Sequence, residues 1–243
     1  MKGGQPDFVQ DMFQQIAPHY DFLNRLLSLR QDVCWRRRMV RRLNLSAGSR
    51  VLDVACGTAD VALEVARRYP QSLYRAVGVD FAPAMLVLAR KKILRAGLSS
   101  KILLAAADAL DLPFADETFN AITIAFGIRN IQDKRAVLKE FFRLLAPGGT
   151  LAILELVVPD RGWAQKIYLE YFNRVLPRIG RLFSKHSFAY SYLPESVARF
   201  PSDRDFRGLM TASGFSNVGC RRFTFGTVAL FTGKKHQASR SDT

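Results

Sequence analysis

Cysteine and histidine are scarce in this sequence of 243 residues, which contains three of each. The cysteines, Cys34, Cys56 and Cys220, lie far apart and form no CxxC pair, which argues against a disulfide framework and for a reducing compartment. The histidines are equally dispersed and show neither HxH nor HExxH spacing. We therefore expect no metal site.

Long apolar segments are absent as well. No stretch reaches the length of a membrane-spanning helix, and the N-terminal MKGGQPDFVQDMFQQ has no apolar signal core. These absences predict a soluble, cytoplasmic protein. Two phosphate-binding fingerprints are also missing, the GxGxxG of dinucleotide-binding folds and the GK[ST] of P-loop proteins.

Acidic residues are few relative to basic ones, 21 against 36, so the formal charge is +15 and the isoelectric point is near 10.2. This balance suits a nucleic acid or an anionic lipid surface, and it is equally compatible with a basic face that meets only water. Residues 7–45 have apolar residues at helical spacing, interrupted at Pro18, and carry RRR at 36–38 and RR at 41–42. We expect this helical region to present a cationic face to solvent or to lipid headgroups.

From Arg50 the sequence alternates short apolar segments with amphipathic ones, in a chain with enough hydrophobic residues (49%) for one large domain. The expected strands are 50–54, 75–80, 101–107, 119–125 and 150–157, and the expected helices are 61–68, 83–96 and 133–145, the last stopped by PGG at 147–149. Alternation of this kind predicts a Rossmann-like, doubly wound, mostly parallel sheet with ligands at the carboxyl ends of its strands.

Beyond Pro159 the composition changes. Residues 163–183 are rich in aromatic side chains and arginine, which predicts a helical insertion, and a further helix is expected over 201–212. Residues 217–225 and 227–232 predict a terminal antiparallel pair, which gives seven strands in all. The resulting single domain has an N-terminal helical lid (1–48), a core (49–158), an insertion (159–200), a C-terminal part (201–233) and a disordered tail (234–243).

The stretch RVLDVACGTAD, Arg50 to Asp60, combines a strand, a small-residue turn and the start of a helix. Exposed backbone N–H groups at such a turn suit an adenosyl or phosphate-bearing cofactor. Asp80 ends the next strand about 20 residues further on, where ribose-binding carboxylates lie in doubly wound folds. The turn and Asp80 therefore predict a nucleotide-type cofactor site.

Gly57, Asp80 and Asp108 thus follow the first three expected strands, an arrangement that resembles the class I S-adenosylmethionine-dependent methyltransferases. The resemblance implies that the turn approaches the methionine part of S-adenosyl-L-methionine, that Asp80 binds the ribose hydroxyls and that residues at Asp108 meet the adenine. Asp53 is expected to orient the turn or the methionine amine. The implied cofactor-binding set is Asp53, Gly57, Thr58, Asp80, Phe81, Asp108 and Ala109.

Three further motifs narrow the resemblance. YDFLNRLLS at 20–28 with Trp35 behind it, FGIRN at 126–130, and RLLAPGG at 143–149 followed by Glu155 are similar to motifs of the ubiquinone/menaquinone biosynthesis C-methyltransferases. The resemblance implies C-methylation of a lipid-tailed quinol and peripheral association with the inner face of an anionic membrane. It leaves the oligomeric state open, a homodimer included.

Methylation of a quinol ring carbon is easier when a ring hydroxyl loses its proton, and a phenol with a pKa of about 10 needs help at neutral pH. Arg129 is the first candidate, because a guanidinium at the cleft could stabilise the phenolate; the alternative is a structural ion pair with Asp133. His19 and Tyr20 lie on the lid segment, His19 as a candidate base. His186 is a comparable alternative.

Other functions remain open on charge alone. A nucleic-acid methyltransferase is disfavoured, because no NPPY-like segment and no Pro-Cys nucleophile follow the fourth strand. A methyltransferase of another small molecule and a non-catalytic membrane scaffold are the remaining alternatives. The intact set of Gly57, Asp80 and Asp108 argues against the scaffold.

Overall fold

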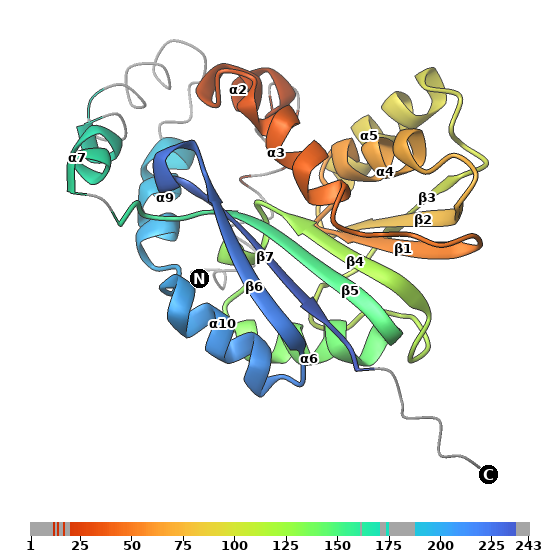
Figure 1. The fold of residues 1–243 in the computed structure, drawn as a ribbon. Helices are drawn as coiled ribbons and strands as arrows, with labels where there is room; N and C mark the ends of the chain where they lie inside the picture. The colour runs from red at the N-terminus through yellow and green to blue at the C-terminus, as the bar shows by residue number, and fades with distance from the viewer. Residues whose placement is uncertain are drawn as a thin grey trace, which may run out of the picture.

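Seven strands form one sheet at the centre of the molecule (Figure 1). The computed structural model describes residues 20–160, 162–170 and 188–236, together with Met12, Gln14, Ala17 and Arg174. The strand order is β3-β2-β1-β4-β5-β7-β6; β1 to β5 run parallel, and β7 is antiparallel to both of its neighbours. The strands are β1 (Ser49–Val54), β2 (Leu73–Asp80), β3 (Ile102–Ala106), β4 (Phe119–Ala125), β5 (Leu145–Leu156), β6 (Ser216–Phe223) and β7 (Val228–Lys234). The doubly wound sheet with an antiparallel C-terminal strand is confirmed.

Helices cover both faces of the sheet. One face carries α3 (Gln31–Val40), α4 (Asp60–Arg68) and α5 (Pro83–Arg95), and the other carries α6 (Lys134–Leu144) and α10 (Asp203–Ala212) (Figure 1). Three more helices lie beyond the carboxyl ends of the parallel strands: α2 (Tyr20–Leu27), α7 (Gly162–Glu170) and α9 (Phe188–Ala198). None of the helices in the described ranges is both long and apolar enough to cross a membrane.

The N-terminal segment divides into two parts with different surroundings. Trp35, Met39 and Val40 of α3 are buried against the sheet together with residues of α4 and α5. From Gln31 onward, the segment that the sequence assigned to a lid is therefore a layer of the core. Only α2 and the residues before it remain candidates for a cover over the strand ends.

Short sequence signals fix several helix boundaries. Pro83 occupies the first turn of α5, where its missing N–H costs no hydrogen bond. The Asp133 carboxylate accepts a hydrogen bond from the Ala136 N–H (2.8 Å), and Ser202 caps α10 through the Asp205 N–H (3.2 Å). These caps place the helix starts within one or two residues of the expected ones.

One boundary was wrong. The PGG segment at 147–149 does not separate helix from strand, because α6 ends at Leu144 and β5 begins at Leu145. The register between β5 and β4 shifts at this segment. Its backbone pairs instead with Lys235, just after β7: the Gly148 N–H donates to the Lys235 carbonyl and the Lys235 N–H to the Gly149 carbonyl, both at 3.0 Å. The segment is thus the irregular first part of β5. Correspondingly, β7 extends to Lys234, a residue that the sequence assigned to the tail.

Two glycines offer a test of the packing. A Cβ on Gly127, just after β4, would lie 2.7 Å from the Ala55 Cβ, whereas a Cβ on Gly208, within α10, would meet nothing within 4 Å. We expect Gly127→Ala to lower the free energy of unfolding by about 1–3 kcal/mol through overpacking. Gly208→Ala should raise it by about 0.5–1 kcal/mol because alanine is the better helix former. Urea unfolding of both variants measures the difference, and equal midpoints would contradict the close approach at Gly127.

Candidate active site

A cavity opens at the carboxyl ends of β1 to β4, where the strand order reverses between β1 and β4. It is lined by the turn after β1, the end of β2 with α5, residues 107–110 after β3 and residues 125–133 after β4. Its volume is about 250 Å³. That lies just below the range of about 300–1,000 Å³ that is usual for small-molecule sites.

The turn after β1 has an unusual backbone. Ala55, Gly57 and Ala59 have φ values of 50°, 53° and 65°, so every second residue is left-handed. Left-handed backbone costs a non-glycine residue about 1–2 kcal/mol, which indicates that the surroundings impose this path. The Gly57 N–H donates to Asp80 Oδ2 at 2.8 Å, so the turn is fixed to the end of β2.

Asp80 is buried at the inner end of the cavity. Its other oxygen, Oδ1, accepts from the Ala82 N–H at 2.9 Å. Burial raises the pKa of this carboxyl, while the N–H groups of Ala82 and Gly57 oppose the rise. Each carboxylate oxygen can accept a second hydrogen bond, so Asp80 keeps acceptor capacity for a hydroxyl in the cavity.

Five of the expected cofactor residues come together in this cavity: Gly57, Asp80, Phe81, Asp108 and Ala109. The other two, Asp53 and Thr58, do not line the cavity. Their side chains are buried and hydrogen-bonded to protein groups.

Asp53 accepts hydrogen bonds from Thr123 Oγ1 (2.8 Å) and from the Ala62 N–H (3.2 Å). It therefore joins β1 to β4 and to the first turn of α4. Burial raises the pKa of its carboxyl to about 7, against the opposing effect of those two hydrogen bonds. Of the two expected roles, orienting the turn is the one these contacts serve.

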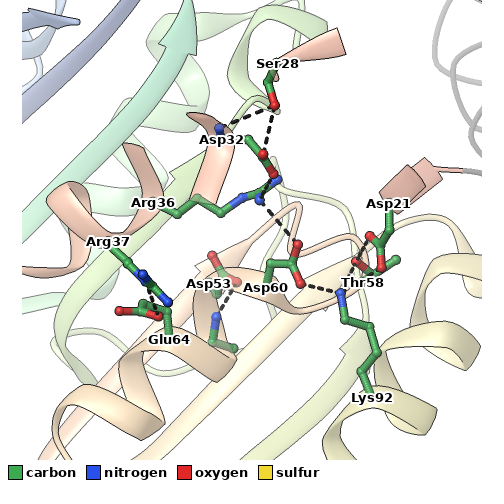
Figure 2. Close-up of polar contacts among 11 residues, drawn as sticks. Asp21, Ser28, Asp32, Arg36, Arg37, Asp53, Thr58, Asp60, Glu64 and Lys92 are labelled. Atoms are coloured by element: carbon green, nitrogen blue, oxygen red, sulfur yellow. Dashed lines mark hydrogen bonds and ion pairs between the residues drawn. The ribbon is translucent and has the colours of Figure 1, made fainter. Parts of the chain in front are cut away.

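Thr58 belongs to a charged network around the ammonium group of Lys92 in α5 (Figure 2). The Thr58 hydroxyl donates to Asp21 Oδ1 at 2.6 Å, and Lys92 Nζ donates to Asp21 Oδ2 and to Thr58 Oγ1, both at 2.9 Å. Lys92 also pairs with Asp60 at the start of α4. Burial alone would raise the pKa of the Asp21 carboxyl, but the bonds from Thr58 and Lys92 outweigh it, and the pKa lies below its ordinary value.

The network continues into α3 (Figure 2). Arg36 Nη1 lies 3.3 Å from the second oxygen of Asp60 and 2.6 Å from Asp32 Oδ2, and Ser28 Oγ donates to Asp32 Oδ1 at 2.8 Å. Arg36 and Asp32 are both buried. Arg36, which the sequence assigned to an exposed cationic face, is therefore internal.

Sequence reasoning missed Lys92, Asp60 and Arg36. One signal could have found Lys92: it lies on the buried stripe of α5, between Ala89 and Ile93, where an apolar side chain is the rule. A basic residue at such a position needs a carboxylate partner. The identity of the partners could not have been read locally, because Asp21 is 71 residues away in the sequence.

At the end of β4, the FGIRN motif forms a strained turn and the short helix η2 (Ile128–Asn130), with Phe126 at φ 59°. Arg129 Nη1 pairs with the fully buried Glu155 Oε1 at 2.7 Å and also bonds the Phe126 carbonyl, while the Arg129 N–H donates to Glu155 Oε2 at 3.1 Å. The ion-pair partner is thus Glu155; the expected partner, Asp133, caps α6 instead.

Two tyrosines from the helical insertion approach the same turn. Tyr192 of α9 donates to Asn130 Oδ1 at 3.2 Å, and Asn130 lines the cavity. Burial raises the pKa of Tyr192 and raises that of Tyr168 in α7 further; in both cases the Arg129 charge opposes the rise. His19, His186 and the side chain of Tyr20 lie outside the described part of the chain.

The fold and the cavity define a class I methyltransferase. The chain belongs to the ubiE/COQ5 methyltransferase family, whose profile matches residues 1–235. It is 48% identical over 227 residues to the ubiquinone/menaquinone biosynthesis C-methyltransferase UbiE of Geobacter sulfurreducens, covering 93% of this chain and 88% of the relative. It is also 48% identical over 224 residues to the demethylmenaquinone methyltransferase of Thermus thermophilus, covering 92% of this chain and 100% of that one.

Among solved structures, the phosphoethanolamine N-methyltransferase 2 of Haemonchus contortus in complex with S-adenosyl-L-methionine has a similar fold. The TM-score is 0.62 at 15% identity, over 83% of this chain and 52% of that one. At this identity the similarity concerns the fold alone.

Removing the Lys92 charge should loosen the network. In Lys92→Met the carboxylates of Asp21 and Asp60 lose their shared cation in a site that is largely closed to water. We expect the free energy of unfolding to fall by about 1–3 kcal/mol. Urea unfolding measures this, with Lys91→Met, an exposed neighbour on the same helix, as the matched control. Equal losses in the two variants would refute the role of Lys92.

Asp53 predicts a pH dependence of stability. The unfolded carboxyl titrates near its ordinary pKa of about 4, and the folded one near 7. Between these values the folded protein holds the extra proton, so the contribution of Asp53 to stability falls as the pH rises through this window. Asparagine does not titrate, and wild type should therefore lose stability relative to Asp53→Asn from about pH 4 to pH 7. If the free energies of unfolding of the two proteins change with pH in parallel over this range, the raised pKa of Asp53 is contradicted.

Proposed function

We propose that this methyltransferase transfers the methyl group of S-adenosyl-L-methionine to a ring carbon of a polyprenylated quinol in menaquinone or ubiquinone biosynthesis. The observation that carries the proposal is one cavity with two different walls. Gly57, Asp80 and Asp108 line one wall, where we place the cofactor, and Phe126, Gly127 and Asn130 line a second wall beside the turn after β1, where we place the acceptor. The names of the two curated relatives, a quinone C-methyltransferase and a demethylmenaquinone methyltransferase, supply the substrate class.

The cofactor wall suits S-adenosyl-L-methionine in its chemistry. Asp80 offers carboxylate acceptors to a ribose diol, and Asp108 offers an acceptor to the adenine amino group. The backbone at Gly57 has no side chain between it and the methionine part. When bound, the cofactor supplies an electrophilic methyl group on sulfonium sulfur. The structurally similar Haemonchus enzyme, solved with this cofactor, supports the assignment at the level of the fold.

The acceptor wall is mostly apolar, with few polar groups. Residues such as Phe126, Gly127 and Ile131 provide a surface for a flat ring, and Asn130, held by Tyr192, provides an amide for a ring oxygen. Alignment of acceptor and donor is the main requirement of methyl displacement. In this proposal the wall fixes the plane of the ring, and Asn130 fixes its rotation.

Of the three expected catalytic residues, Arg129 receives a different role and His19 and Tyr20 keep theirs. The Arg129 charge is neutralised by Glu155, so we assign Arg129 to holding the acceptor wall in place and not to binding a phenolate directly. His19 as the base and Tyr20 as part of the cover remain predictions from the sequence. A substrate with an isoprenoid tail resides in a membrane, and the charge of +15 supports peripheral association with an anionic membrane surface.

The purified protein should methylate a demethylated naphthoquinol or benzoquinol with a short tail when S-adenosyl-L-methionine is present. Mass spectrometry of the quinone would show one added methyl group. In Asp80→Ala both the diol acceptor and the bond to the Gly57 N–H are lost, so cofactor affinity, measured by calorimetry, should fall at least 100-fold. Asp111→Ala, an exposed carboxylate near the same wall, is the control and should bind normally. Undiminished affinity in Asp80→Ala would refute the cofactor assignment, and transfer of methyl groups to total RNA but not to quinol would refute the substrate class.

A further inference from the structure

Two apolar side chains are held in solvent by strained backbone. Leu29, between α2 and α3, is 79% exposed with φ 51°, and Phe225, in the short helix η4 (Thr224–Gly226) between β6 and β7, is 69% exposed with φ 55°. Glycine or asparagine occupies left-handed positions at least cost, so both residues are disfavoured twice, by backbone conformation and by exposure. Among the described residues, neither side chain belongs to a buried hydrophobic cluster.

These two residues share one surface. Thr224, next to Phe225, donates to Gln31 Oε1 at 2.7 Å and accepts from Trp35 Nε1 at 3.0 Å, which fixes η4 against the start of α3 beside Leu29. The Phe225 ring in turn meets the ring of Trp163, at the start of α7, with centroids 5.5 Å apart, and Trp163 is 50% exposed. Three segments that are distant in sequence thus bring exposed apolar side chains together.

Arginines adjoin this apolar group. Arg30 follows Leu29 directly, and Arg37, Arg38 and Arg41 line a shallow hollow along the outer side of α3 with it. All four are exposed, and within the described ranges the only ion pair that any of them forms is the 3.6 Å contact of Arg37 with Glu64. The hollow therefore retains a positive charge of about three.

We propose that this face of the protein docks onto an anionic lipid bilayer. The docking surface consists of Leu29, Trp163, Phe225, Arg30, Arg37, Arg38 and Arg41. Apolar and aromatic tips enter the headgroup–acyl boundary, and the arginines contact lipid phosphates, which is the combination that interfacial segments use. The proposal deepens the proposed function and rests on it for its purpose, since it gives the enzyme access to an acceptor in the membrane.

The position of the surface agrees with that purpose. α2, α7 and the β6–β7 connection all lie on the side toward which the carboxyl ends of β4 and β5 point (Figure 1). The cavity opens on the same side of the sheet, at the carboxyl ends of β1 to β4. A ring entering from the bilayer would meet the acceptor wall without crossing the sheet.

Lipid fits the observations better than nucleic acid. A polyanionic strand would use the arginines and could stack on the two rings, but it gives no reason to expose an aliphatic side chain such as Leu29. A bilayer uses all three apolar tips and the arginines at once.

The proposal is tested by vesicle binding. Wild type and variants are sedimented with vesicles of phosphatidylcholine containing about 30% phosphatidylglycerol. In Leu29→Asn/Phe225→Asn the new residues tolerate left-handed backbone, so the fold is unchanged or stabilised while vesicle affinity falls at least tenfold. In Arg37→Gln/Arg38→Gln affinity falls about 25-fold, fivefold for each charge, on the basis of about 1 kcal/mol for each basic residue at an anionic surface.

Matched controls come from α5, on which Leu94, Arg90 and Arg95 are also exposed. Leu94→Asn repeats the Leu→Asn change, and Arg90→Gln/Arg95→Gln repeats both charge changes, at another place; both variants should bind vesicles within about threefold of wild type. Equal losses at both places would mean that total charge and hydrophobicity drive binding, and this would overturn the assignment. Retained vesicle binding in Leu29→Asn/Phe225→Asn would also overturn it, as would loss of binding to mixed tRNA without loss of binding to vesicles.

Tryptophan fluorescence gives a direct readout. The chain has two tryptophans; Trp35 is buried and Trp163 is half-exposed. Emission should shift to shorter wavelength on addition of anionic vesicles, and the shift should vanish in Trp163→Phe. A shift that persists in that variant contradicts insertion at this site.

Turnover separates this proposal from the proposed function. The surface variants should methylate a short-tailed, water-soluble quinol at the wild-type rate and lose activity on a long-tailed quinol embedded in vesicles. If wild type methylates neither quinol, the proposed function fails while the vesicle result stands on its own. If the variants retain full activity on the embedded quinol, the docking surface is wrong.

Discussion

The ammonium group of Lys92 lies where three parts of the chain meet: α2, the turn after β1 and the start of α4. Three carboxylates of the network, those of Asp21, Asp32 and Asp60, are opposed by only two cations, Lys92 and Arg36, in surroundings that largely exclude water. Charges so placed are stable only when each keeps its partners. The path of the cofactor turn is therefore coupled to the position of α2.

The same helix also reaches the acceptor side. Leu23 of α2 is buried against Tyr168 of α7 and Val197 of α9, and those helices place tyrosines near Arg129 and Asn130. One face of α2 is thus fixed by charge to the cofactor wall, and another is packed on the acceptor wall. A displacement of α2 would disturb both walls together, so under the proposed function it would affect cofactor and acceptor at the same time.

The parts that could be predicted from sequence depend on local pattern. Continuous apolar runs such as residues 119–125 gave the strands, and the rule that ligands lie at strand ends brought Gly57, Asp80 and Asp108 into one cavity. The errors lie where contacts between segments distant in the sequence determine the local structure. The PGG segment joins β5 because it pairs with Lys235, and Arg36 is internal because Asp60 lies across from it. The Thr58 side chain does not line the cavity, because Gly57 and Ala59 on either side of it have left-handed backbone, and hydrophobic periodicity does not reveal such a conformation.

Ten non-glycine residues of the described chain have left-handed backbone, and the contrast between two of their settings bears on function. Ala59 in the cofactor turn is wholly buried, so packing and the hydrogen bonds of the turn offset the strain. The turns at Leu29 and Phe225 are closed by backbone hydrogen bonds, from the Arg30 N–H to the Arg25 carbonyl (2.7 Å) and from the Thr227 N–H to the Thr224 carbonyl (3.1 Å), but the two side chains lie mostly in water. A conformation that costs about 1–2 kcal/mol and leaves most of an apolar side chain exposed lowers stability in the isolated protein. It is explained when the side chains are buried in a second body, and a bilayer that carries the acceptor is the body that the neighbouring arginines select.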